Sequence, residues 1–452
     1  MKKLLIIFAI PLFTGNVHAA QQQTPHYSDI LVIGDSQSDI ANGPENQTLI
    51  DPIADKIATN LYVPISNPVN PQKDNILPSL SKKGFKFPVV SNHFIMTLPP
   101  QADICASGKC SKRKYLPLNW VSYFLYNAQK KNLITSPIDL RPWIIQYKQP
   151  ITNASLNQSV DYAWYSAMSG NTCNRFDYTP TPCTSTKYPN NLSNSLYYGQ
   201  KYYRDNQSKN NAKANIELRE KTVIIPGAQQ QVALFKSDLK NHRIKVNSDT
   251  LYIVWSGSND ISLAFSTYLG IHILQFIKQI RHTIPDKIAN TNNQQSVVSQ
   301  LINLGAKNIL VVGQYNLGFT PTLFTMLPNV IRNNSVMKSI VISFVGFLTS
   351  CFNASLKKNL AAYHLKYPNI HIAYVDIATP IKQQLSRNNA VNYYNTLGQR
   401  CEDTAVSDIK NGDAVNCYDA PSHPLGWWNN SHVATQLNQL IAYSILRQAE
   451  KL

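Results

Sequence analysis

Ile30-Leu31-Val32-Ile33-Gly34-Asp35-Ser36 sets the architecture of this chain, because an unbroken aliphatic run leads directly into a Gly-Asp-Ser turn. A run without polar alternation is typical of a strand that is buried on both faces of a parallel sheet. Parallel sheets bind their ligands outside the carboxyl ends of their strands. Ser36, at such an end and before a predicted helix, is therefore a candidate functional residue. Taken alone, the turn could equally be a structural one with a serine helix cap.

Three further apolar runs each end at a glycine or a polar residue, and they cover residues 251–255, 308–312 and 371–375. Helical patterns occupy residues 229–240, 271–304, 350–367 and 434–451. This alternation of strands and helices predicts an α/β fold with one mainly parallel sheet that is covered on both faces.

Two regions interrupt the alternation. Residues 41–116 are rich in Pro, Asn and Ser, and residues 171–225 are rich in Asn, Tyr and Lys. Connections of this length are usually functional covers or mobile segments. We therefore interpret residues 28–448 as a single domain with two long loop insertions.

The first twenty residues have the pattern of a signal peptide. Lys2 and Lys3 precede an apolar run from Leu4 to Phe13, and small residues follow around Ala19. The run is shorter than the ~20 helical residues that span a bilayer, although an uncleaved anchor is the alternative. We expect cleavage after Ala19 or Ala20 and secretion into the periplasm or the medium.

The chain is basic, with 42 Lys and Arg against 25 Asp and Glu and a formal net charge of +17. The lysines are scattered among Asn and Gln, and no sustained basic run carries interleaved aromatic residues. This distribution argues against a nucleic-acid partner and leaves solvated lysines, or a peripheral contact with an anionic membrane surface, as interpretations.

Six of the seven cysteines form three sequence-local pairs, which are candidates for disulfides in an oxidising compartment. Cys351 is left over in an apolar helical stretch, and the spacing alone does not prove the pairing. None of the spacings resembles a zinc site, and neither an HExxH motif nor a Walker loop occurs, so we expect no metal and no organic cofactor. The candidate pairs are Cys105–Cys110, Cys173–Cys183 and Cys401–Cys417.

Two other polar segments carry residues suited to catalysis. Trp255-Ser256-Gly257-Ser258-Asn259-Asp260 follows a predicted strand, and the Asn259 amide could donate to an oxyanion. Residues 426–432 precede the last predicted helix, and His432 could act as a general base for a serine. In isolation, an Asn-Asp turn and a structural histidine explain these residues as well.

Taken in order, these segments resemble the GDSL or SGNH hydrolases, in particular the bacterial branch of secreted phospholipases A, lysophospholipases and glycerophospholipid–cholesterol acyltransferases. Residues 33–39 are similar to the family's GDSLSD block, and residues 251–260 are similar to its LYVVWxGxND block. Residues 308–321 resemble the strand that runs into a Leu-Gly-x-Thr-Pro turn. The resemblance extends from about residue 28 to residue 448 and is interrupted by the two insertions.

The resemblance implies a three-layer α/β/α fold and a serine esterase that acts on phospholipid or lysophospholipid, with a sterol as a possible acyl acceptor. It implies that Ser36 attacks the ester carbonyl and that His432 takes and returns the proton. The Ser36 backbone N–H and the Asn259 side chain would bind the oxyanion, which is the logic of a catalytic triad on another fold.

Two departures from the family pattern concern the residues around Ser36. Asn429 stands where the family has the aspartate that orients the histidine, and Asp419 could substitute for it. A competing alignment pairs Asp419 with His423, but it has one residue too many and abandons the helix after His432. Ser166 replaces a glycine whose N–H joins the oxyanion hole, with Gly170 as another stand-in.

These departures keep two alternatives open. The chain could be a catalytically weakened relative that binds lipid or glycan without turnover. It could also be a polysaccharide acetylesterase, which would need the same serine and the same oxyanion donors.

Overall fold

The computed structural model of the chain describes residues 25–39, 62–64, 86–88, 120–134, 140–143, 159–164, 167–171, 173–175, 180–181, 224–245, 247–268, 272–320, 323, 327–387, 433 and 435–452. The predicted signal peptide lies outside the described residues, as do most of the two predicted insertions. Within the insertions, two short antiparallel sheets are described. The first pairs β2 (Tyr62–Pro64) with β3 (Lys86–Pro88). In the second, β6 (Cys173–Arg175) lies between β7 (Pro180–Thr181) and β8 (Ile224–Ile225).

A six-stranded sheet forms the centre of the fold, in the order β11-β10-β9-β1-β5-β4, and every pairing in it is parallel. The predicted strands are confirmed, and two short strands that the sequence did not reveal extend one side of the sheet. The strands are β1 (Ile30–Gly34), β4 (Arg141–Pro142), β5 (Val160–Asp161), β9 (Leu251–Trp255), β10 (Asn308–Val312) and β11 (His371–Val375).

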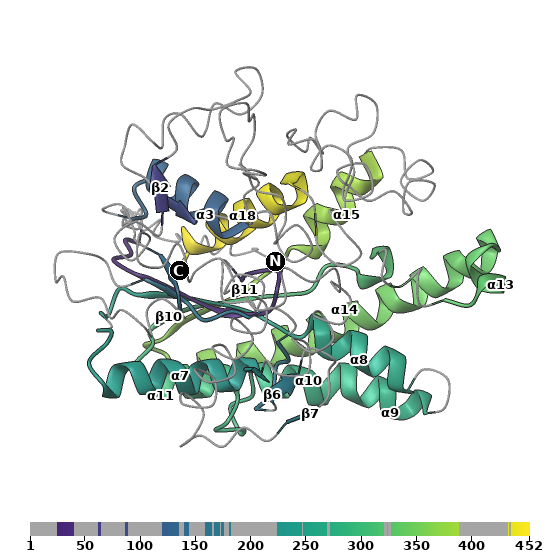
Figure 1. Ribbon diagram of the computed structural model, residues 1–452, viewed down its shortest axis with the longest axis horizontal. Coiled ribbons are helices and arrows are strands. Elements are labelled where there is room, and N and C mark those ends of the chain that lie inside the picture. Colours follow the sequence, from purple (N-terminus) through teal and green to yellow (C-terminus); the bar gives the residue numbers. More distant parts are fainter. Residues whose placement is uncertain are drawn as a thin grey trace, which may run out of the picture.

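Helices cover both faces of this sheet, so the predicted α/β class and its three layers are confirmed (Figure 1). One layer contains α3 (Trp120–Lys130), α15 (Ala378–Arg387) and α18 (Thr435–Ala449). The other contains α7 (Ala228–Lys240), α8 (Ser258–Tyr268), α9 (Ile273–Lys278), η4 (Gln279–Thr283), α10 (Ile284–Ile288), α11 (Val297–Asn303) and α14 (Ser335–Lys366). The single helical stretch expected at 271–304 is in fact several helices, with Pro285 at the start of α10 and a turn before α11.

The sheet has its topological switch point between β1 and β9. From β1 the chain crosses to β4 and β5 on one side, and it then returns to β9 on the other side. Residues 30–34 of β1 pair in register with residues 251–255 of β9, and all ten are buried. Connections leave this point in opposite directions, and parallel sheets bind their ligands outside the carboxyl ends of the strands at such a point.

Gly34 closes β1 at a point where there is no room for a side chain. A Cβ on Gly34 would lie 2.4 Å from the carbonyl oxygen of Trp255. The backbone of Gly34 is bonded to one glutamine of α7: its N–H donates to Gln231 Oε1 (2.9 Å), and its carbonyl accepts from Gln231 Nε2 (2.8 Å). Gln231 thus satisfies the backbone groups of a buried strand end, which would be costly to leave unpaired.

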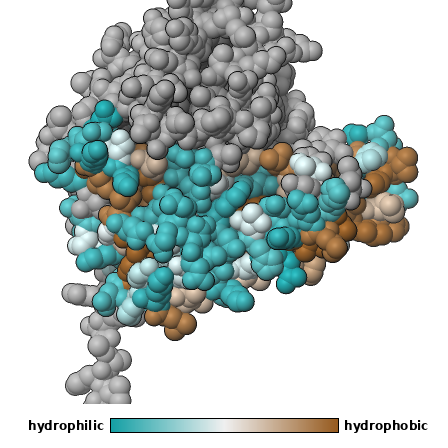
Figure 2. All heavy atoms as spheres, turned by 90° about the horizontal axis from the view of Figure 1, so that it is seen from below, coloured by the Kyte–Doolittle hydropathy of each residue, from teal (hydrophilic) through white to brown (hydrophobic). Residues whose placement is uncertain are grey.

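Helix α14 is far longer than the sheet that it covers. Its buried residues form a stripe from Ile342 to Tyr363, whereas residues 335–341 are mostly exposed. Among the described residues it is the one helix long and apolar enough to cross a membrane, but this stripe gives it the character of a core helix from Ile342 onward. With α13 (Asn329–Arg332) it forms the projecting right-hand end of Figure 1, where hydrophobic residues gather in Figure 2.

We expect Gly34→Ala to destabilise the fold by about 3 kcal/mol, because the added methyl group must displace the backbone of β9. Urea unfolding followed by circular dichroism would measure the change. Gly170→Ala is the matched control, since its Cβ would meet only the flexible side chain of Lys287 at 3.4 Å. Equal losses in the two variants would contradict the close packing of β1 against β9.

Candidate functional site

Ser36 lies in a tight turn directly after β1. The N–H groups of Ser38 and Asp39 both donate to the carbonyl oxygen of Asp35, at 3.0 Å and 3.1 Å, and they close the turn around Ser36. Ser36 is buried, as are its neighbours from Asp35 to Asp39. The turn therefore holds the serine at the switch point of the sheet, as predicted, and the described part of the turn ends at Asp39.

Asp35 joins the loops that follow β1 and β9. Its Oδ2 accepts a short hydrogen bond from Ser258 Oγ, and its Oδ1 accepts from the backbone N–H of Gln37 at 3.1 Å. Asp35 precedes Ser36 and Ser258 precedes Asn259, so this one bond holds side by side the two loops that carry the predicted nucleophile and the predicted oxyanion donor. No pattern in the sequence indicates this contact, because 223 positions separate the two residues.

Burial raises the pKa of Asp35 to about 6 from its ordinary value of 3.8. The hydrogen bonds from Ser258 and Gln37 oppose this effect, and the negative charge of nearby Asp260 adds to it. The carboxyl group therefore acts mainly as a structural acceptor whose charge is costly in this environment.

Asn259 lies in the first turn of α8, after a sharp change of direction at Gly257, whose φ is +112°. Only a glycine adopts this conformation without strain, and it lets the chain turn from β9 directly into the helix. Asn259 Nδ2 donates to the carbonyl oxygen of Ala167 at 3.0 Å. A side-chain amide has two N–H donors, and the second has no partner among the described residues, so it could donate to an oxyanion.

Asp260 fixes a third loop beside this helix. Its carboxylate accepts from the Ser169 N–H (2.7 Å) and the Ser169 hydroxyl (2.9 Å), and Lys287 Nζ lies 3.5 Å away. Together with the bond from Asn259 to Ala167, this anchors the segment 167–171 to the start of α8. Ser166 itself lies outside the described residues, and Gly170 lies against the side chain of Lys287.

The start of α18 lies at the same edge of the sheet. At the other end of α18, the carbonyl oxygen of Ala449 accepts from the hydroxyl of Tyr27, which precedes β1 at the amino edge. A helix of 15 residues is about 22 Å long, so α18 begins toward the carboxyl edge. Val433, before this helix, is buried and its carbonyl accepts from Asn438 Nδ2 at 2.9 Å.

Several predicted residues lie outside the described residues, namely His432, Asn429, Asp419 and His423. Cys351 is half-buried in α14 with a free thiol, and the backbone of Cys173 begins β6. The predicted disulfides therefore stay predictions. The other cysteines outside the described residues are Cys105, Cys110, Cys183, Cys401 and Cys417.

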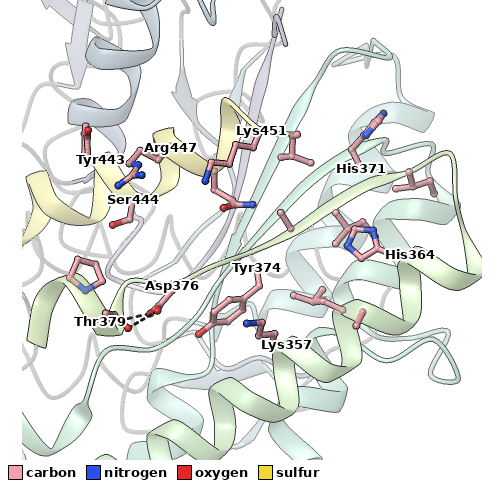
Figure 3. A pocket seen from close by; sticks show the side chains of 18 of the residues that line it. Lys357, His364, His371, Tyr374, Asp376, Thr379, Tyr443, Ser444, Arg447 and Lys451 are labelled. Atoms are coloured by element: carbon pink, nitrogen blue, oxygen red, sulfur yellow. Dashed lines mark hydrogen bonds between the residues drawn. The ribbon is translucent and has the colours of Figure 1, made fainter. Parts of the chain in front are cut away.

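A hollow of about 960 Å³ lies elsewhere, along the edge strand β11 (Figure 3). Some of its polar groups have structural roles: Asp376 accepts from Thr379 and from two backbone N–H groups at the start of α15, and Ser444 Oγ donates to the carbonyl of Leu440. None of its lining residues belongs to the turn of Ser36 or to the loop before α8. We therefore place the candidate active site at the switch point and not in this hollow.

Comparison with known proteins gives a distant and partial similarity. No family model matches the chain. The GDSL esterase/lipase ENOD8 of Medicago truncatula is 29% identical over 133 residues, which are 29% of this chain and 31% of that protein. The match thus spans about a third of the relative's length, and it supports an ester hydrolase at the level of the GDSL/SGNH family.

The buried carboxyl of Asp35 predicts a specific dependence of stability on pH. Between about pH 4 and pH 6 the folded chain holds the Asp35 proton more tightly than the unfolded chain. The contribution of this proton to the free energy of unfolding is therefore full at low pH and is lost as the pH rises. Asp35→Asn removes the titration. From pH 4 to pH 7 the wild type should therefore lose about 2 kcal/mol of unfolding free energy that the variant does not lose.

Urea unfolding at a series of pH values would measure this difference. Asp376→Asn is the control, because it changes an exposed carboxylate at the end of another strand, β11. A pH-dependent gain of the same size in the control would show that the burial of Asp35 is not its cause.

Proposed function

We propose that the chain is a secreted serine esterase of the GDSL type that hydrolyses lipid esters, with Ser36 as its nucleophile. The observation that carries this proposal is the hydrogen bond from Ser258 to Asp35, which brings Ser36 and Asn259 together at the carboxyl ends of β1 and β9. The partial similarity to a GDSL esterase/lipase supports the same reaction class. The predicted signal peptide is the basis for secretion.

In the proposed reaction, Ser36 Oγ attacks the ester carbonyl while His432 takes its proton. The negative charge that develops on the carbonyl oxygen is stabilised by the Ser36 backbone N–H and by the Asn259 amide, with Ser166 N–H as a further donor. Fixed donors of this kind act strongly because they need no reorganisation as the charge develops. His432 then returns the proton to the leaving alcohol, and water releases the acyl group.

Phospholipid or lysophospholipid is the proposed substrate, and a sterol could replace water as the acyl acceptor. The resemblance to the bacterial phospholipases and acyltransferases is the basis for this choice. The basic charge of the chain, +17, favours the surface of a membrane that contains anionic lipid.

We expect Ser36→Ala to abolish hydrolysis of both a soluble short-chain ester and lysophosphatidylcholine, because no other group replaces the nucleophile. Ser38→Ala is the matched control: Ser38 lies two residues away in the same turn, and its buried hydroxyl has no hydrogen-bond partner among the described residues. Its removal should leave the rate within a few-fold of the wild type. A fluorophosphonate probe should label the wild type and the control but not Ser36→Ala.

Activity or labelling that survives in Ser36→Ala would refute the proposed role of this serine. No labelling of the wild type, together with binding of lipid or glycan, would favour the second candidate, a binding protein without turnover. Asn429 is the observation that favours this candidate, because an amide does not stabilise a protonated histidine by charge.

Asn429→Asp tests how far this substitution weakens catalysis. If His432 is the base, the restored carboxylate should raise kcat by at least about tenfold, since the reverse change in serine proteases costs up to ~10⁴. Steady-state kinetics on the soluble ester would measure the effect. An unchanged kcat, with Asp419→Asn strongly impaired, would instead assign the orienting role to Asp419.

A further inference from the structure

Exposed apolar side chains gather on the projecting end of α14. Val336 and Ile340, which are 65% and 57% exposed, lie four residues apart and therefore on the same face of the helix. Val330 of α13 is 82% exposed, and α13 packs against the first turns of α14. Single exposed apolar residues are ordinary, but neighbours on a projection indicate a surface that meets another apolar phase (Figure 2).

The neighbouring helices α8 and α9 add to this apolar surface. Leu274 at the start of α9 is 81% exposed, and Leu263 of α8 is also exposed. Leu263 follows Asn259 by one helical turn, so an exposed apolar side chain lies near the candidate active site. Helix α8 packs on α9, and the continuation of α9, η4, packs on α14.

The direction of α14 places this projection at the edge that carries Ser36. A short turn joins the end of α14 to the start of β11, so the helix runs antiparallel to the strands and begins at their carboxyl edge. Its 32 residues span about 48 Å. A five-residue strand spans only about 17 Å, so the first turns of α14 extend well past the sheet on the side of the site.

The charge of the segment that contains these helices indicates which kind of apolar partner their exposed side chains would contact. Residues 261–375 contain nine Lys and Arg but a single acid, Asp286, whereas the whole chain has 42 basic and 25 acidic residues. Lys278 of α9 and Arg332 of α13 are exposed beside the apolar side chains. Exposed apolar side chains beside basic ones, in a segment that is poor in acids, match an anionic bilayer, where the former enter the acyl boundary and the latter contact headgroups.

We propose that Val330, Val336, Ile340 and Leu274, with Lys278 and Arg332, form a docking surface for a bilayer that contains anionic phospholipid. The docking surface seats the chain in the interface, and α14 does not cross the bilayer, because its stripe from Ile342 to Tyr363 is buried in the protein. Docking turns the carboxyl edge of the sheet toward the lipid. The delivery of lipid esters to Ser36 rests on the proposed function, whereas the docking itself does not.

Vesicle binding of the mature chain carrying Ser36→Ala tests the docking surface without consuming the lipid. We expect it to sediment with vesicles of phosphatidylcholine and phosphatidylglycerol, and to bind phosphatidylcholine vesicles at least about tenfold more weakly. Val336→Ser with Ile340→Ser should lower binding to the mixed vesicles by at least about tenfold. Leu365→Ser is the matched control, because Leu365 is 89% exposed on the same helix but at its other end.

Equal binding by the control and the double variant would overturn the proposal. So would a dimer of the chain that the double variant converts to a monomer while vesicle binding is unchanged, since the surface would then join two copies. Arg332→Gln with Lys278→Gln should remove the preference for phosphatidylglycerol, and a preserved preference would assign the headgroup contact elsewhere.

Activity separates this proposal from the proposed function. With Ser36 intact, the double variant Val336→Ser and Ile340→Ser should hydrolyse a soluble short-chain ester at the wild-type rate and lose at least about tenfold of its rate on vesicle lipid. Equal losses on both substrates would contradict docking. A wild-type chain that hydrolyses neither ester would refute the proposed function, and vesicle binding would still decide the docking surface.

Discussion

The parallel pairing of β1 with β9, closed at its carboxyl end by the hydrogen bond from Ser258 to Asp35, is the constraint on which the rest of the site depends. The pairing makes the two strands end side by side, and the absence of a side chain at Gly34 lets their ends come close. The bond then fixes the two loops at the positions next to Ser36 and Asn259. Neither loop could move alone without breaking this partly buried hydrogen bond, which is costly to the extent that water cannot replace the partner.

Burying the carboxyl of Asp35 has a cost in free energy that the fold accepts. Burial raises its pKa to about 6, and burial raises the pKa of Asp238 to about 6 as well, although Tyr162 and Trp143 both donate to that group. Asp238 accepts from two side chains of the core, whereas Asp35 joins the two loops of the candidate active site. A neutral side chain would be cheaper to bury at position 35, but it could not accept from Ser258 and Gln37 with both oxygens.

The sequence predicts the strands well and the contacts between loops poorly, for physical reasons. Strands buried on both faces leave continuous apolar runs, so β1, β9, β10 and β11 could be read directly, whereas the two-residue strands β4 and β5 are too short to leave a pattern. Because parallel strands carry their ligand-binding residues at their carboxyl ends, the sequence was enough to predict that Ser36 and Asn259 lie at the same edge of the sheet. The hydrogen bonds of Gln231 with Gly34 and of Asp260 with Ser169 join residues far apart in sequence. No pattern in the sequence around these residues indicates that they are in contact. The first half of α14 was also missed, because its apolar residues lie on exposed faces as well as buried ones and obscure the helical period.

The topology of the sheet explains why the docking surface and the candidate active site share an edge. In a parallel sheet, every strand ends where the helices that run back along it begin, so the starts of α8 and α14 lie on the same side as Ser36. A helix that overhung the sheet at its other end, near Leu365, would display its apolar residues away from the site. The overhang of α14 therefore lies on the same side of the sheet as Ser36. Residues 261–375, which include most of these helices, carry nine Lys and Arg against a single acid, so acids are scarcer there than along the rest of the chain.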